Sequence, residues 1–502
     1  MTFRNLEAPF GRALLAIVFM APAMSAQTFD SAKLDAIAAE AMRAWKVPGT
    51  AVAIIQDDRV VVSKGYGVKR IGTNDPVTKD TIFAIGSATK AFTSCAVAML
   101  MDDGKMQWDD PVRKHVPFFR LSDPMANELV TLRDLLSHRT GLSRHDLLWV
   151  NSPLTQEEII EHIGSVPLSK PFRTAYQYQN IMFLTAGYAV GQASGGTWQE
   201  FVQKRILNPL GMTNSDLTTS AAEKSPNHSS PHGPGKDGSL GVIPWRNIDN
   251  IAPAGAVNAS VEDMTKWVRL QLNEGVFEGK RLVSERNLHE THIPQTVIRP
   301  EDAGRSYNPD THQTAYGLGW FVQDYHGVGL VEHGGAIDGF RSNITLVPEK
   351  KLGIVVLSNL NQENMPEALR WSILDLVLGF EPRDWNALLI ERGRKEREDG
   401  QKARKELEAT RRPNTKPTHD LAGYAGTYRN AGYGAVSIGA GPNGLEAGWL
   451  NNHSPLEHFH FDTFLCKTGA LDGQPVQFNL NPRGEIVSLD LVNMNFRKEK
   501  LQ

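Results

Sequence analysis

The stretch Thr81-Ile82-Phe83-Ala84-Ile85-Gly86-Ser87-Ala88-Thr89-Lys90 decides the fold of this sequence. Its apolar first half is typical of a strand, and Gly86 marks a turn. From Ser87 to Asp103 the residues are apolar on nearly every face of a helix, and Gly104 ends the pattern. Because a helix that is apolar all round must be buried, we predict a central buried helix that begins at Ser87.

Ser87 and Lys90 stand three residues apart, a spacing that places both side chains on one face of a helix. A lysine amine beside a serine hydroxyl can take up its proton, and the free N–H groups at a helix start can stabilise an oxyanion. At ordinary residue frequencies a chain of about 500 residues contains roughly one or two such spacings by chance. The pattern therefore needs partners elsewhere in the chain.

Two kinds of partner are required, a hydroxyl-and-amide unit and a strand that bears a basic residue and glycine. Tyr178-Gln179-Asn180 supplies the first and His333-Gly334-Gly335 the second. Competing matches are His162-Ile163-Gly164, Tyr428-Arg429-Asn430 and Lys467-Thr468-Gly469. Only Ser87, Tyr178 and His333 give the order Ser, Tyr, His within the main part of the chain.

Strand patterns stand at both ends of a helical middle. The β-branched runs 50–55 and 60–63, joined by Gln56-Asp57-Asp58-Arg59, predict a hairpin. Further strands are predicted at 319–322, 342–347 and 353–357, and helices within 130–210, at 264–272 after Ser260 and Asp263, and at 365–378. The polar segment from Ser215 to Asn250 is predicted to be a long loop that shapes the substrate pocket. Together these elements predict one α+β domain closed by its termini.

The last part of the chain has a different pattern. Glu391 to Arg412 is a mixed-charge run with the helical pairs Glu391/Lys395 and Glu398/Lys402, which indicates a solvated helical linker; a binding surface is the alternative. Beyond Pro417 apolar and polar residues alternate in short runs, as in Val476, Phe478, Leu480 and in Val487, Leu489, Leu491. Such alternation predicts a small β-meander or barrel.

Together these residues resemble the serine hydrolases related to class C β-lactamases, penicillin-binding DD-peptidases and D-aminopeptidases. The landmarks, in family order, are Thr81–Ser87, Trp108–Val112, Leu135–Leu142, Tyr178–Asn180, Pro253–Ala256 and His333–Phe340. Tyr424–Tyr428 and Tyr433-Gly434 resemble the lipocalin-like C-terminal domain of some members. The resemblance implies an α+β domain of the β-lactamase/DD-peptidase type, with an antiparallel sheet flanked by helices and an all-helical part, followed by a small all-β barrel. We expect a signal peptide over 1–26, the hydrolase domain over 27–385, the charged linker over 386–417 and the barrel over 418–502.

The resemblance also implies a role for each site residue. Ser87 attacks a carbonyl to form an acyl-enzyme, and Lys90 and Tyr178 share the proton transfers; which of the two is the base stays open. Substrate and oxyanion contacts are implied for Asn180, His333, Gly335 and Ala336, with the backbone N–H groups of Ser87 and Ala336 as the oxyanion hole. Because a free phenol has a pKa near 10, Tyr178 needs cationic neighbours such as Lys90 to ionise.

One departure from the family pattern bears on the substrate. Members that act on β-lactams or D-Ala-D-Ala carry Lys-Thr/Ser-Gly where this chain has His333-Gly334-Gly335. A neutral histidine and a residue without a hydroxyl hold a carboxylate weakly, so amidase, peptidase or esterase activity is favoured. With the ordinary pKa of histidine near 6.5, we expect a limb in the pH profile near 6 to 7 that reports His333.

Composition excludes several other classes of protein. The 53 Lys and Arg residues against 56 Asp and Glu give a net charge of −3, without the basic excess of a nucleic-acid binder. Cys95 and Cys466 are too few for a four-thiolate zinc site or an iron–sulfur cluster, and a bridge between them cannot be inferred. No serine lies in the Gly-x-Ser-x-Gly pattern of α/β-hydrolases. We expect no metal and no cofactor; a metal held by His458 and His460 is the alternative.

The N-terminus has the pattern of an export signal. Ala13 to Met24 is an apolar run preceded by Arg4 and Arg12 and followed by small residues around Ala26. The run suits a signal peptide and is short for a spanning helix, which needs about 20 residues; a retained anchor is the alternative. We therefore expect a periplasmic or secreted protein with no membrane span after cleavage.

These observations predict an exported serine hydrolase that cleaves an amide bond, in a peptide or a D-amino-acid amide, or an ester bond through an acyl-enzyme on Ser87. The substrate is a small molecule or a peptide, and no nucleic-acid partner is expected. Two alternatives stay open: a non-catalytic cell-wall or peptide-binding protein of the same fold, and a true β-lactamase or DD-carboxypeptidase. The sequence leaves the oligomeric state open.

Overall fold

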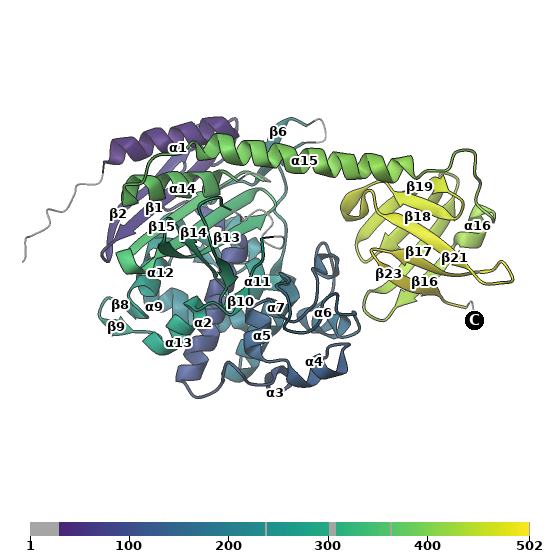
Figure 1. Cartoon of the computed structure of the whole chain (residues 1–502), viewed down its shortest axis with the longest axis horizontal. Coiled ribbons are helices and arrows are strands. Elements are labelled where there is room, and N and C mark those ends of the chain that lie inside the picture. Colours follow the sequence, from purple (N-terminus) through teal and green to yellow (C-terminus); the bar gives the residue numbers. More distant parts are fainter. Residues whose placement is uncertain (1–29, 236–237, 301–307, 362–363, 501–502) are drawn as a thin grey trace, which may run out of the picture.

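The computed structural model describes residues 30–235, 238–300, 308–361 and 364–500. It contains an α+β part, from α1 (Ser31–Trp45) to α14 (Met365–Leu378), and a closed antiparallel barrel. The long helix α15 (Trp385–Ala409) joins them (Figure 1). The predicted fold class is confirmed, whereas the predicted signal peptide, 1–26, lies outside the described residues.

An antiparallel eight-stranded sheet forms the centre of the α+β part. Its strand order is β10-β11-β12-β13-β14-β15-β1-β2. The bounds in that order are Thr296–Val297, Thr314–Tyr316, Phe321–Tyr325, Val328–Ile337, Phe340–Val347, Leu352–Ser358, Gly49–Gln56 and Arg59–Gly67. The first two strands of the chain thus complete a sheet whose other strands come from residues 296–358, near the end of the α+β part. This is what the prediction of a domain closed by its termini requires.

Strand β1 is buried on both faces of the sheet. Ala51, Ala53 and Ile55 join one hydrophobic core, and Val52 and Ile54 join the other. This division follows from the pleat, which points successive side chains to opposite faces. A continuous apolar run is therefore what a strand with helices on both sides needs.

The hairpin of β1 and β2 is confirmed. Its two turn residues, Asp57 and Asp58, have φ of 51° and 61°. Two-residue hairpin turns require this left-handed conformation, which aspartate tolerates better than most residues.

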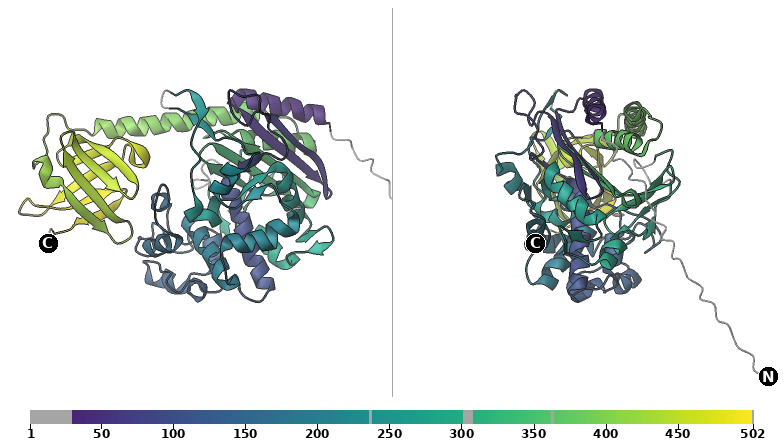
Figure 2. Two further views of the ribbon diagram at one scale, coloured as in Figure 1. Left: turned by 180° about the vertical axis from the view of Figure 1, so that it is seen from behind. Right: turned by 90° about the vertical axis from the view of Figure 1, so that its left-hand side faces the viewer.

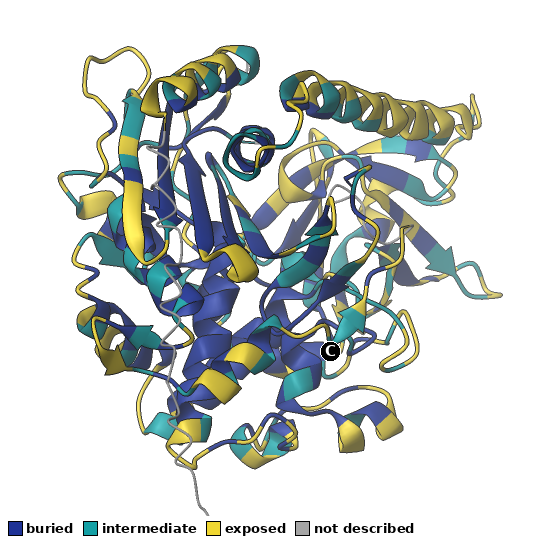
Figure 3. Ribbon diagram, turned by 60° about the vertical axis from the view of Figure 1, so that its left-hand side comes forward, coloured by how far each residue is buried: buried dark blue, intermediate teal, exposed yellow. Residues whose placement is uncertain are grey.

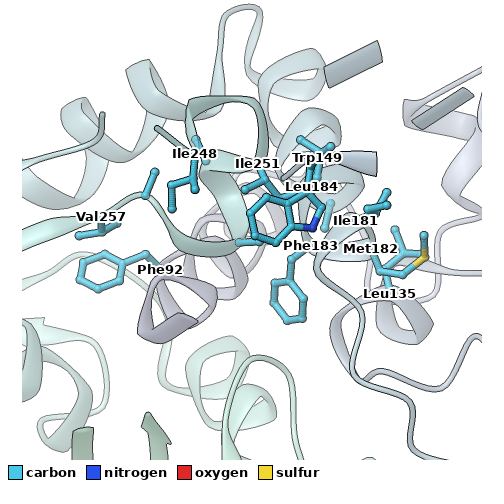
Figure 4. Packing of buried hydrophobic residues seen from close by; sticks show 14 of the residues in the cluster. Phe92, Leu135, Trp149, Ile181, Met182, Phe183, Leu184, Ile248, Ile251 and Val257 are labelled. Carbon is cyan, nitrogen blue, oxygen red and sulfur yellow. The ribbon is translucent and has the colours of Figure 1, made fainter. Parts of the chain in front are cut away.

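Helix α12 (Val261–Leu272) packs on one face of the sheet, against β1, β2 and β15. Helix α2 (Thr89–Asp102) lies next to α7 (Asn180–Ser194), α11 (Ala252–Gly255) and α13 (Glu285–His292). Every residue of α2 from Thr89 to Leu100 is buried, as its all-round apolar pattern predicts. Phe92 stacks on Trp267 with ring centroids 3.9 Å apart. Side chains of α2 meet those of α5 (Leu132–Leu136) and α7 (Asn180–Ser194) in one continuous core (Figure 4).

The remaining helices of this part are short. They are α3 Val112–His115, α4 Pro124–Leu129, α6 Gln156–Ile163, α8 Trp198–Val202, α9 Asn208–Leu210, α10 Thr219–Lys224, α11 Ala252–Gly255 and α13 Glu285–His292. The predicted capping of α12 is confirmed, since the Ser260 side chain accepts a hydrogen bond from the Asp263 N–H at 3.1 Å.

The outer face of the sheet is covered by α1, α14 and the start of α15. Helices α1 and α15 lie side by side (Figure 2). The Trp45 indole donates to Asn386 Oδ1 at 2.9 Å, and Trp371 stacks on Trp385 with centroids 5.4 Å apart. These contacts fix the first turns of α15 on the sheet.

The segment from Ser215 to Asn250 is not the single long loop that its composition predicts. It contains β4 Ser215–Asp216, α10 Thr219–Lys224 and the strand pair β5 His232–Pro234 with β6 Leu240–Val242. The His232 ring has a hydrogen-bond partner at each nitrogen, the Ile71 N–H at 3.0 Å and the Asn359 carbonyl at 2.8 Å. Such contacts give a Pro- and Gly-rich segment an ordered path.

Beyond its first turns α15 leaves the sheet and is mostly exposed (Figure 3). Glu391 lies 3.9 Å from Lys395, as predicted. Glu398 pairs with Arg394 rather than Lys402, and Lys402 lies 3.9 Å from Glu406. Both observed pairs also stand at i,i+4, so the spacing alone could not choose between them.

The barrel is closed by pairing of its first and last strands. After α16 (Leu421–Tyr424) its strands β16 to β23 are Gly426–Asn430, Gly434–Gly441, Gly444–Trp449, Asn452–His460, Thr463–Cys466, Pro475–Leu480, Ile486–Leu491 and Met494–Lys498. The predicted alternation in β22 is wrong at its start, because Val487 is exposed and Ile486 is buried. A register irregularity between Asn479 and Leu480 in the neighbouring strand accompanies this change of face.

Cys95 and Cys466 are both buried free thiols, one in α2 and the other in the barrel. Within the described ranges, no helix is long and apolar enough to cross a membrane.

Candidate active site

Two glycines allow the turn before α2 to lie against strand β13. Gly86 has φ of 54°, and a Cβ atom there would lie 2.7 Å from the backbone N of Ala336. A Cβ atom on Gly335 would lie 1.7 Å from the carbonyl oxygen of Ile85. Residues 86–88 form a short 3-10 turn, so Ser87 stands at the start of the buried helix and beside Ala336.

Lys90 is fully buried and has three hydrogen-bond partners. Its Nζ lies 3.1 Å from Ser87 Oγ, 2.8 Å from Asn180 Oδ1 and 2.8 Å from the carbonyl oxygen of Ala254. Burial and the nearby Arg144 guanidinium lower the pKa of Lys90 well below its usual value. Both effects favour the neutral amine, which is the form that can accept the proton of Ser87.

Tyr178 lies just before α7, and its ring is flanked by the Lys90 amine and the Arg144 guanidinium. Lys90 Nζ is 4.7 Å from the ring centroid and Arg144 Cζ is 5.1 Å from it. Burial raises the pKa of Tyr178, although a hydrogen bond with Ser87 and the charge of Arg144 oppose that shift. The expected neighbour Lys90 is present together with Arg144, but burial dominates and the phenol keeps its proton.

Arg144 and Asp146 belong to this site and are absent from the sequence prediction. The Arg144 Nε donates to Asp146 Oδ2 at 2.7 Å, and the Asn180 amide donates to Asp146 Oδ1 at 3.0 Å. Asn180 thus bridges Asp146 to Lys90. The Leu135–Leu142 landmark ends two residues before Arg144, so closeness to this landmark is the feature of the sequence that points to Arg144.

His333 is buried and does not titrate where the sequence led us to expect. Its Nε2 lies 3.0 Å from the Tyr316 hydroxyl and its Nδ1 lies 2.6 Å from the carbonyl oxygen of Gly334. Burial, together with the charge of Lys90, lowers the pKa of His333 to about 3. The expected limb near pH 6 to 7 is therefore wrong as an assignment to His333, because this ring stays neutral throughout that range.

His138 is a second buried imidazole at the site, and unlike His333 it is not among the predicted site residues. Its Nδ1 accepts the Gln179 N–H at 3.1 Å, and its ring lies 4.3 Å from the ring of Tyr178. Burial lowers the pKa of His138 well below its usual value. The residue belongs to the quoted Leu135–Leu142 landmark, but nothing in its spacing indicates contact with Tyr178.

These groups open into a cavity of about 280 Å³. Its lining comprises Ser87, Arg144, Tyr178, Phe321, Glu332, His333, Gly334, Gly335, Ala336, Arg341, Ser342, Asn343, Asn364, Pro366 and Glu367. None of these lining residues belongs to the segment 215–250. That segment contributes Trp245 and Arg246 to a neighbouring hollow that also includes Ile337 and Asp338, and its part in shaping the substrate pocket stays a prediction. Strand β12 pairs with β13 only from Val328 to Glu332, so the edge of β13 from His333 to Ile337 faces the cleft without β12.

The competing sequence matches lie elsewhere. Tyr428 is in barrel strand β16, Lys467-Thr468-Gly469 follows β20, and His162 is in α6. His458 and His460 are on β19, and in the part of the chain that the structure describes no three His, Cys, Asp or Glu side chains gather as a metal would require.

The fold and the gathering of Ser87, Lys90 and Tyr178 define a serine hydrolase. The chain matches the beta-lactamase family model over residues 34–378, and residues 410–502 match a Domain of unknown function (DUF3471). Because the first match spans more than half of its length, the chain belongs to the β-lactamase family.

Known proteins similar to this chain include hydrolases. An unguisins hydrolase (ungD') of Aspergillus campestris is 30% identical over 88% of this chain and 85% of its own length. The octameric penicillin-binding protein homologue from Pyrococcus abyssi has a TM-score of 0.62 at 24% identity, covering 93% of this chain and 99% of that one. A D-stereospecific amidohydrolase from Streptomyces sp. has a TM-score of 0.57 at 21% identity, covering 68% and 98%. The two structures share the fold with this chain.

The close packing of Gly335 beneath the site can be tested with a matched pair of substitutions, at Gly335 and at its neighbour Gly334. We expect Gly335→Ala to lower the free energy of unfolding by about 1–3 kcal/mol, because its methyl group meets backbone that cannot move aside. For Gly334→Ala the nearest atom is the Ser342 carbonyl oxygen at 3.4 Å, an ordinary contact, and little change is expected. Urea unfolding of both variants measures the difference, and equal midpoints would contradict the close approach of Ile85 to β13.

Proposed function

We propose that this chain is an exported hydrolase that cleaves an amide or ester bond through an acyl-enzyme on Ser87. The observation that carries the proposal is the 3.1 Å contact between Ser87 Oγ and the buried Lys90 amine. A lysine held in a dry site with a lowered pKa is a proton acceptor suited to neutral pH. Lys90 rather than Tyr178 is then the base that activates Ser87.

In the acylation step Ser87 Oγ attacks the substrate carbonyl carbon while its proton moves to Lys90 Nζ. The carbonyl oxygen becomes an oxyanion, which the backbone N–H groups of Ser87 and Ala336 stabilise. Tyr178, still protonated, relays a proton to the leaving amine or alkoxide as the C–N or C–O bond breaks, and it regains one from Lys90. Water then attacks the Ser87 ester with Lys90 again as base, which releases the acid and restores the free serine.

Arg144 and Asp146 influence these reaction steps through charge and position. The Arg144 guanidinium disfavours a second positive charge on Lys90, and Asp146 orients Asn180, whose oxygen accepts from Lys90. His138 and Tyr316 fix the rings of Tyr178 and His333. Pre-positioned groups of this kind lower the reorganisation needed at the moment of reaction.

An amide substrate with an extended backbone is the class that the cleft fits best. The edge of β13 from His333 to Ile337 offers main-chain groups to a peptide strand. Gly334 brings no hydroxyl, and the neutral His333 brings no charge, so capture of a β-lactam or D-Ala-D-Ala carboxylate lacks its usual partners. The name of the similar D-stereospecific amidohydrolase supports amide cleavage, and that of the unguisins hydrolase supports hydrolysis.

The first test of the proposal is covalent labelling. A fluorophosphonate probe should label Ser87 in the wild type, and Lys90→Ala should slow labelling by about 100-fold or more, because general-base assistance is lost. Lys467→Ala, which alters the competing Lys-Thr-Gly match in the barrel, is the control and should label like the wild type. Mass spectrometry locates the adduct. An unlabelled Ser87 counts against the proposal and favours a non-catalytic binding protein, whereas equal rates in the two lysine variants contradict Lys90 as the base.

The second test uses the pH dependence of kcat/KM. Since the neutral Lys90 is the active form, the rate falls as the pH drops through the pKa of Lys90. Arg144 lowers that pKa, so Arg144→Gln should raise it and move the acid limb to higher pH. Arg341→Gln removes another cleft arginine that does not contribute to the shift of Lys90 and should leave the limb in place. A limb that stays in place in Arg144→Gln would rule out Lys90 as the titrating base.

Export and the domain boundaries complete the proposal. We propose that residues 1–26 are a removed signal peptide, that 27–385 form the hydrolase domain, and that the linker 386–417 carries a lipocalin-like barrel over 418–502. When the full chain is produced in a Gram-negative host, N-terminal sequencing of the periplasmic protein should find a new start close to Ala26. A cytoplasmic protein that begins at Met1 would contradict export.

A further inference from the structure

The segment Ser143–Ser152, between the Leu135–Leu142 landmark and α6, has one side against the active site and the other against the barrel. On the active-site side, Arg144 lies over the ring of Tyr178, and Asp146 accepts the Asn180 amide. We call this segment the site loop. The position of the site loop determines where the charges of Arg144 and Asp146 lie near Lys90.

The barrel contacts the other side of the site loop. The Tyr433 hydroxyl lies 2.6 Å from Nδ1 of His145, the residue between Arg144 and Asp146. The Asn151 amide lies 3.2 Å from the Asn451 carbonyl oxygen and 3.3 Å from Asn452 Oδ1. A further contact, from His162 Nδ1 to the Gly432 carbonyl oxygen at 3.1 Å, ties the barrel to α6.

Tyr433 is itself held rigidly within the barrel. Its ring stacks on Trp449 with centroids 5.3 Å apart, and the Trp449 indole donates to the Tyr433 carbonyl oxygen at 2.8 Å. Asn430 Oδ1 accepts the backbone N–H groups of Gly432 and Tyr433 at 2.8 and 3.0 Å. With only 4% of its surface exposed, Tyr433 presents its hydroxyl to His145 in one orientation.

The hydrolase part holds the backbone of the site loop near its two ends. Gln179 Nε2 donates to the Ser143 carbonyl oxygen at 2.5 Å, and the Asn250 amide donates to the Trp149 carbonyl oxygen at 3.0 Å. Between these anchors the His145 side chain contacts Ser143 Oγ, at 3.3 Å within the loop itself, and the Tyr433 hydroxyl. The hydrogen bond that the His145 side chain makes outside the site loop is therefore with Tyr433 of the barrel.

We propose that the barrel is a positioning element of the active site, in which Tyr433 holds His145 and thereby keeps Arg144 and Asp146 against Tyr178 and Asn180. The inference rests on the proposed function of Ser87 and Lys90. Burial raises the pKa of Tyr433 and lowers that of His145, so both groups are neutral around pH 7 and the contact needs no charge. Tyr433 is not among the residues that line the cleft, and it acts on the rate of reaction through the site loop.

The test is Tyr433→Phe in the full chain, which removes the hydroxyl and keeps the ring on Trp449. With a p-nitrophenyl ester as substrate, kcat should fall about fivefold, the size expected for one lost net hydrogen bond, while KM stays within about twofold. Tyr428→Phe is the matched control. It also removes a buried barrel hydroxyl, one that donates to the Tyr424 carbonyl oxygen at 2.7 Å, but it does not touch the site loop.

A second measurement separates positioning from loss of stability. Hydrogen exchange in residues 143–152 should increase in Tyr433→Phe and stay unchanged in Tyr428→Phe. The inference is overturned if kcat and loop exchange in Tyr433→Phe match the wild type, or if both tyrosine variants lose activity equally. Failure of the wild type to label at Ser87 would overturn the proposed function instead, so the two failures are distinguishable.

Discussion

The burial of one amine is the constraint on which the rest of the structure depends. A buried lysine amine is costly unless its hydrogen-bonding positions are satisfied, and Lys90 has partners in Ser87, Asn180 and the Ala254 carbonyl oxygen. Those partners come from three separate elements, the 3-10 turn over residues 86–88, α7 and α11, so they can meet only if α2 lies at the centre of the domain. The apolar character of α2 on every face is the sequence counterpart of that requirement.

The sequence predicted the parts of the fold and site that local pattern specifies. Helix α14 and the cap of α12 follow from periodicity and capping, and Ser87 and Lys90 follow from helical spacing. Arg144 and Asp146 were missed because their role comes from a loop that folds back over Tyr178, a contact no local pattern encodes. The titration of His333 was wrong for a related reason, since an ordinary pKa holds only in water and the sequence does not show that Tyr316 and Phe321 enclose the ring.

The cleft is shaped by elements that carry no recognised motif. Asn364, Pro366 and Glu367 line it from the start of α14. Arg341 stands opposite Ala336 on the neighbouring strand. Selection among substrates is thus separated from the chemistry: the helix that begins at Ser87 supplies the reacting groups, while the edge of the sheet and the start of α14 supply the surroundings that a leaving group or acyl group meets.

The rigid geometry of α15 restricts how the length of this chain can change during evolution. An α-helix turns about 100° and rises about 1.5 Å with each residue. Losing or gaining a single residue in the exposed half of α15 therefore rotates the barrel by more than a quarter turn and carries Tyr433 away from His145. A disordered connection would absorb such a change without effect. Almost any polar side chain suits the solvent-facing positions of this helix, so the helix tolerates substitution. It does not tolerate insertion or deletion of a residue.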